Sequence, residues 1–193
     1  MSEFFAEQAA HHGVALEEPV LIRVSHAALE APPSRADRAG VLATMLWSLR
    51  TRYWAWRVSA RDPLPTPDIQ VFALYQQRQD GIALPDSVGL SKGLFAIAHL
   101  YATPAAGDAN QVVIAHELLH TLGATDKYDV ATGRPRLPDG VAEPDRRPVY
   151  PQDRGEIMAG RIALSPTEAV VPDDLHAMVV GAATAQEIGW TKP

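Results

Sequence analysis

Two histidines one helical turn apart are the residues of this chain with the clearest chemical potential. Residues 112–129 read VVIAHELLHTLGATDKYD, where Glu117 directly follows His116 and His120 comes four positions after His116. In a helix, residues four apart share a face, so two such imidazoles can bind one zinc ion at about 2.0–2.1 Å each. Glu117 lies off that face, close enough to take a proton from a water on the metal. The spacing predicts a zinc site with Glu117 as general base, although the same pentamer also occurs by chance on solvated helix faces.

The residues after His120 offer a third ligand. Gly123 lets the chain reverse after the helix, and the reversal returns Asp126 toward the metal. Three protein ligands leave one zinc position open for water, which distinguishes a catalytic site from a structural one. Other carboxylates downstream compete with Asp126 for this role, namely Asp129, Glu143 and Glu156.

The segment 116–126, HELLHTLGATD, resembles the extended zinc signature of the metzincin metallopeptidases. Its final aspartate is similar to the variant of snapalysin-like and immune-inhibitor-A-like peptidases, whereas most metzincins have histidine there. The resemblance implies a Zn²⁺ cofactor bound by His116, His120 and Asp126, and hydrolysis of peptide bonds in a peptide or protein substrate. We therefore expect a zinc-dependent endopeptidase.

Metzincins also have a methionine turn beneath the metal, and Met158, in GEIMAG, is well placed after the signature for that turn, with core packing as its alternative role. Tyr128 and Tyr150 are candidates for a hydroxyl that stabilises the oxyanion, with packing as the alternative role of each. His99 interrupts a mostly apolar run and is a candidate substrate contact, with a structural role as its alternative.

Two other functions compete with this interpretation. A metalloprotease scaffold can serve as a catalytically silent binding module, with structural zinc or none. Peptide deformylase shares H-E-x-x-H but takes a cysteine as third ligand, and this chain has no cysteine. The lack of cysteine also excludes disulfides and thiolate-bound zinc, so His, Asp or Glu must hold any metal.

Composition bounds the class of protein. The chain has 193 residues, of which 47% are hydrophobic and 21% charged, values typical of one folded, water-soluble domain. The net charge of -6, without a cluster of Lys or Arg, argues against a nucleic-acid partner. No stretch is apolar enough for a membrane span, and the first residues lack a secretory signal. Localisation and oligomeric state stay open, and removal of a leader would imply an exported or envelope-associated protein.

Hydrophobic patterning predicts one α/β (α+β) domain over residues 1–193, in a metzincin-like order of elements. The expected elements are strands of a twisted mixed sheet at 19–25, 68–77 and 93–103, a backing helix at 37–58, the signature helix at 109–123 and a C-terminal helix at 174–188. Asp108 and Gln111 have the spacing of a capping box for the signature helix. The residues after Asp129 are rich in proline, glycine and arginine, and predict an irregular surface loop, with the rim of the substrate cleft as the alternative.

The backing helix is amphipathic in this interpretation, with an apolar face that packs against the sheet. The apolar residues at helical spacing are Val41, Leu42, Met45, Leu46, Leu49, Tyr53 and Trp56. Residues 47–57 carry three tryptophans and three arginines, so a membrane-interface or partner-binding face is the alternative.

Overall fold

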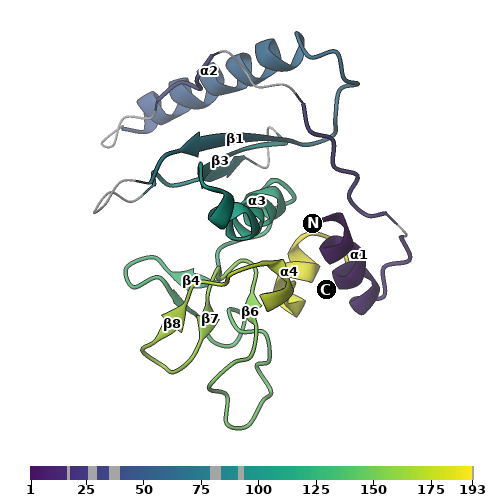
Figure 1. Ribbon diagram of the computed structural model, residues 1–193, viewed down its shortest axis with the longest axis vertical. Coiled ribbons are helices and arrows are strands. Elements are labelled where there is room, and N and C mark those ends of the chain that lie inside the picture. The colour runs from purple at the N-terminus through teal and green to yellow at the C-terminus, as the bar shows by residue number, and fades with distance from the viewer. Residues whose placement is uncertain (17, 26–29, 35–39, 79–83, 91–93, 193) are drawn as a thin grey trace. The chain divides into compact units, whose positions relative to one another are not determined.

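The computed structural model describes residues 1–193 apart from 17, 26–29, 35–39, 79–83, 91–93 and 193 (Figure 1). The chain divides into two compact units. Unit 1 comprises Met1–Leu21 and Ile69–Pro193, and unit 2 comprises Ile22–Asp68. Helices and strands occur together, so the expected α/β class is confirmed at that level. The expectation of one domain over residues 1–193 stays a prediction.

A three-stranded mixed sheet organises unit 1. Strand β3 (Phe95–Tyr101) lies between β1 (Gln70–Gln76) and β2 (Val88–Leu90), parallel to β1 and antiparallel to β2. β1 and β3 confirm the strands expected at 68–77 and 93–103. Helix α3 (Gly107–Thr121) contacts all three strands, so the signature residues are built directly onto this sheet.

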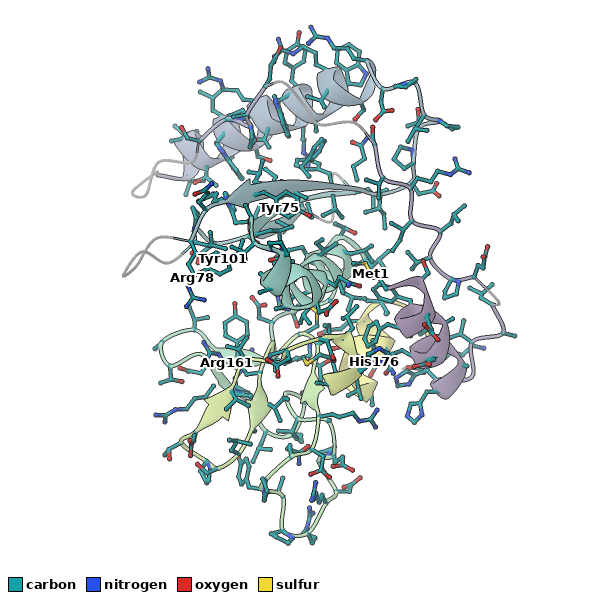
Figure 2. The ribbon with its side chains drawn as sticks, viewed as in Figure 1. Met1, Tyr75, Arg78, Tyr101, Arg161 and His176 are labelled. Atoms are coloured by element: carbon teal, nitrogen blue, oxygen red, sulfur yellow. The ribbon has the colours of Figure 1, made fainter. Side chains whose placement is uncertain are left out.

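Asn110 fastens α3 to the central strand. Its side-chain carbonyl accepts a hydrogen bond from the Tyr101 N–H at 3.1 Å, and its amide donates to the Tyr101 carbonyl at 2.9 Å. The buried Asn110 amide thus satisfies both backbone groups of Tyr101 at the end of β3 and sets where α3 begins relative to the sheet. The ring of Tyr101 makes a separate contact, because the guanidinium of Arg78 lies over it, 5.7 Å from its centroid (Figure 2).

The start of α3 differs from the prediction. The helix begins at Gly107, directly after the 3₁₀ turn η2 (Pro104–Ala106), two residues before the expected start. The expected capping box is wrong, because no side chain caps the first turn and Asp108 accepts a hydrogen bond from the Gln111 side chain at 3.2 Å instead. Entry from a 3₁₀ turn replaces the side-chain cap.

The end of α3 is as predicted. Gly123 has a φ of 105°, a conformation that costs glycine little. The Gly123 N–H donates to the His120 carbonyl and the Ala124 N–H to the Leu119 carbonyl, each at 3.1 Å. These two bonds form a Schellman motif, which reverses the chain immediately after the helix.

Short strand pairs make up the C-terminal part of unit 1. β4 (Tyr128–Asp129) pairs with β5 (Arg134–Pro135), β6 (Gly155–Glu156) with β9 (Met178–Val179), and β7 (Ile162–Ala163) with β8 (Ala169–Val170). The helix expected at 174–188 is only partly present, as the 3₁₀ turn η3 (Leu175–Ala177) and helix α4 (Ala182–Glu187). Pairing with β6 keeps β9 extended between them, a tertiary effect that overrides local propensity.

The prediction of a strand at residues 19–25 is wrong. These residues have no regular secondary structure, and Leu21 and Val24 are 65% and 91% exposed. A strand needs a hydrogen-bonded neighbour, and none of the described strands pairs with this segment. The chain before it forms helix α1 (Ser2–His11; Figure 1).

The core of unit 1 joins α1 and α3 to the C-terminal segments. Phe5 of α1, Leu119 of α3 and Met178 of β9 are at most 1% exposed and belong to one apolar cluster with Ile157 and Met158. The turn at residues 157–158 is therefore packed into the same core as the helix that carries the histidines.

Unit 2 contains helix α2 (Val41–Ser59), which confirms the helix expected at 37–58, although residues 37–39 lie outside the described part. The seven residues of its expected apolar face are at least 57% exposed, and packing of that face against the sheet stays a prediction. The opposite face packs on residues 30–33, where the indole N–H groups of Trp47 and Trp54 donate to the carbonyls of Pro33 and Glu30 at 2.9 and 3.2 Å. No helix in the described ranges is long and apolar enough to cross a membrane.

Candidate metal centre

The two signature histidines face each other on α3. Their Nε2 atoms are 3.0 Å apart. The Nδ1–H of His116 donates to the Ile157 carbonyl at 2.9 Å, and that of His120 donates to the Ala124 carbonyl at 2.8 Å. Because a carbonyl oxygen only accepts, both rings carry a proton on Nδ1 and turn Nε2 toward each other.

Asp126 completes a group of three with these rings. Its Oδ1 lies 3.3 Å from His116 Nε2 and 3.2 Å from His120 Nε2. Among the residues that the structure describes, these three side chains form the group that could hold a metal ion. The structure therefore brings together the three residues that the sequence pattern singled out as ligands.

The rival carboxylates lie elsewhere. Glu156 is fully buried and accepts a hydrogen bond from the Thr184 hydroxyl at 2.6 Å. Asp129 accepts hydrogen bonds at 2.8 Å from the backbone and hydroxyl of Thr132. Glu143 accepts a hydrogen bond from an arginine side chain at 3.1 Å. Each rival is occupied by other partners, so the geometry favours the aspartate that faces the histidine pair.

The donor set fits a zinc ion. Ligand atoms on a tetrahedral zinc at about 2.0–2.2 Å are separated by about 3.3–3.6 Å. The three separations here are 3.0, 3.2 and 3.3 Å. Asp126 Oδ1 is buried and makes no hydrogen bond, although both ring nitrogens are within ion-pair distance of it. Two ring lone pairs and a carboxylate oxygen this close repel one another unless a metal ion or a proton lies among them.

The charges within the group are mutually dependent. The nearby His116 ring lowers the pKa of Asp126, and burial opposes that shift. Burial lowers the pKa of His116, but its interactions with Asp126, Glu117 and the Ile157 carbonyl together raise it above the usual value. Burial and the neighbouring His116 lower the pKa of His120. The group therefore favours one positive charge shared by its members.

Glu117 lies beside the group. It is only 5% exposed, and its Oε2 is buried without a hydrogen-bond partner. Burial raises the pKa of Glu117 to about 7, and His116 opposes that shift. Strand β2 crosses next to it, where a Cβ on Gly89 would be 2.5 Å from His120 Cβ and 3.5 Å from Glu117 Oε2. Glycine at this position is what allows the edge strand and the site to lie in contact.

Tyr128 is the oxyanion candidate that the structure places near the group. Burial raises the pKa of its hydroxyl, and the charges of Asp126 and Glu117 raise it further. Tyr150 is half-buried in the irregular segment, and it remains a candidate on the sequence pattern alone.

His99 has a structural partner on the neighbouring strand. Its Nδ1 is 2.9 Å from the side-chain nitrogen of Gln76 at the end of β1. Burial lowers the pKa of His99, and the charge of Asp86 offsets part of that shift. This pairing accounts for a histidine in an apolar strand, and contact with substrate stays a prediction.

Met158 lies in the turn that supports the histidines. It is fully buried, and its carbonyl accepts a hydrogen bond from the Lys127 N–H at 2.9 Å, while the carbonyl before it holds His116. One turn therefore touches both the helix arm and the loop arm of the group. This position agrees with the methionine turn of the resemblance, but it does not identify a metzincin.

Several residues that build the site were not singled out by the sequence pattern. Gly89 had a readable signal, because glycine inside a short strand often marks a close backbone approach. Asn110 had only its polarity in a helix as a signal. The carbonyls of Ile157 and Ala124 had none, because every residue supplies a backbone carbonyl.

Comparison with known proteins adds no identification. No protein-family model, no curated protein and no solved structure matches the chain. The interpretation of the site depends on its own geometry and on the resemblance of residues 116–126.

Proposed function

We propose that this chain is a zinc-dependent endopeptidase. One observation carries the proposal: three donor atoms converge at 3.0–3.3 Å next to a buried glutamate whose Oε2 has no hydrogen-bond partner. The resemblance of HELLHTLGATD to metzincin signatures supports peptide bonds as the substrate.

His116, His120 and Asp126 are the residues that would hold the zinc ion. The ion supplies a Lewis acid that polarises a peptide carbonyl and lowers the pKa of water. The chain keeps both imidazoles ready for this role, because the Ile157 and Ala124 carbonyls hold each ring in the tautomer that leaves Nε2 free.

Glu117 performs the proton transfers. Its carboxylate takes a proton from the attacking water and returns that proton to the amine that leaves when the peptide bond breaks. Its unpartnered Oε2 is the atom available for this transfer. Tyr128, half-buried next to Asp126 and Glu117, is the candidate hydroxyl that donates to the oxyanion.

The test combines metal content with cleavage. We expect one zinc per chain by elemental analysis, and cleavage of casein or a peptide library that disappears in Glu117→Ala while zinc is retained. Anomalous scattering at the zinc edge locates the ion and its ligands. Zinc-loaded protein that cleaves no peptide would refute the endopeptidase and indicate a catalytically silent binding module.

A further inference from the structure

We propose that Glu187, the last residue of α4, is a positioning residue that holds Asp126 at the metal group. The inference depends on the proposed metal site, and it concerns a residue that touches neither metal nor substrate. It assigns to the C-terminal helix the task of fixing the third arm of the site.

Asp126 needs such support more than the histidines do. The histidines project from α3, whereas residues 124–127 have no regular secondary structure. A metal ligand must be held within about 0.5 Å of its productive position. The Asp126 carboxylate oxygen that faces the rings makes no hydrogen bond to the protein, so its direction comes from the backbone on either side.

Thr125, directly before Asp126, is bound to Glu187 through two groups. Its N–H donates to Glu187 Oε2 at 2.9 Å, and its hydroxyl donates to Glu187 Oε1 at 2.7 Å. Both carboxylate oxygens are therefore used on one residue, which fixes the orientation of its peptide as well as its position.

Lys127, directly after Asp126, binds the same carboxylate. Its Nζ lies 2.7 Å from each Glu187 oxygen, 3.0 Å from the Thr125 carbonyl and 2.8 Å from the Thr125 hydroxyl. The lysine side chain is only 7% exposed, and Glu187 is the carboxylate that pairs with it. One carboxylate, 60 residues away in the chain, thus holds both neighbours of Asp126.

Metal affinity measures this role without requiring catalysis. We expect Glu187→Gln to weaken zinc binding by about 10–100-fold, measured by competition with a chromophoric chelator, as is typical of groups that orient a ligand. In an Asp126→Ala background, the same Glu187→Gln change should cause no further loss. A residue that merely stabilises the fold would weaken both backgrounds equally. Asp153→Asn, which breaks an ion pair at 2.8 Å with Arg146, is the matched control and should leave the affinity unchanged.

A milder variant covers the case in which Glu187→Gln does not fold. Thr125→Val removes the hydroxyl at the centre of the network and keeps the ion pair, and it should weaken zinc binding only in the presence of Asp126. The inference is overturned if these variants lose zinc affinity equally in the wild-type and Asp126→Ala backgrounds, or lose none in either. Wild-type protein that binds no zinc overturns both the inference and the proposed function. If the variants lose zinc affinity as expected but the wild-type protein cleaves no peptide, only the proposed endopeptidase activity is overturned.

Discussion

Replacing Glu117 with glutamine is expected to stabilise the metal-free protein at neutral to alkaline pH. Burial raises the pKa of Glu117 to about 7, above its ordinary value of 4.5. The folded chain therefore prefers the protonated carboxyl, and the stability that this preference confers is complete below pH 4.5. That stability is lost as the pH rises through about 7, because the buried carboxylate must then ionise without a partner. A glutamine cannot ionise and does not suffer this loss.

The magnitude follows from the two pKa values. Each tenfold change in a protonation constant is about 1.4 kcal/mol, so ionising Glu117 costs the folded chain about 3 kcal/mol more than the unfolded chain. For a chain of this length, 1 kcal/mol corresponds to about 2–4 °C in Tm. We expect Glu117→Gln to raise Tm by about 10 °C at pH 8–9, and by little or nothing at pH 4.

Thermal unfolding followed by circular dichroism, in excess chelator and across pH 4 to 9, measures the difference between variant and wild type. Titrating groups that do not interact with Glu117 contribute equally to both proteins and cancel. His116, whose pKa Glu117 helps to raise, contributes to the difference together with Glu117. Glu7→Gln, an exposed glutamate on α1, is the matched control and should show no pH-dependent difference. A Tm difference for Glu117→Gln that stays constant with pH would show that burial does not perturb this carboxyl.

Two further changes test the packing around the site. Gly89→Ala places a Cβ 2.5 Å from His120 Cβ, so we expect a loss of about 1–3 kcal/mol in unfolding free energy together with weaker zinc binding. Gly107→Ala is the control, because Gly107 lies on α3, the helix that carries His120, and a Cβ there would have nothing within 4 Å. It should leave zinc binding unchanged and not lower Tm. Equal behaviour of the two variants would contradict the close approach of Gly89 to His120. Thr184→Val removes the 2.6 Å hydrogen bond to buried Glu156 and should cost about 1.5–3 kcal/mol at pH 7 by calorimetry, with Thr184→Ser as the retained-hydroxyl control. A fully stable Thr184→Val would show that this bond contributes nothing.

Elements with strong local signals were predicted correctly. Strands β1 and β3 followed from apolar and β-branched runs, and the end of α3 followed from Gly123. Residues 19–25 had the same local pattern but pair with none of the strands that the structure describes. Helix α2 was predicted, and apolar residues lie on both of its faces. One face contacts residues 30–33, while packing of the other face against the sheet stays a prediction. Local pattern predicts an element, and its neighbours decide which side is buried.

The sequence by itself determined the pair of imidazoles and the reversal after them. Residues four apart on any helix share a face, and a glycine with positive φ turns the chain wherever the helix ends. Only the tertiary structure decided which carboxylate faces His116 and His120. Asp126 does so because residues far along the chain, in the turn at 157–158 and at Glu187, hold the loop and the rings. Such long-range contacts depend on the folded arrangement of distant segments, and no local spacing encodes them.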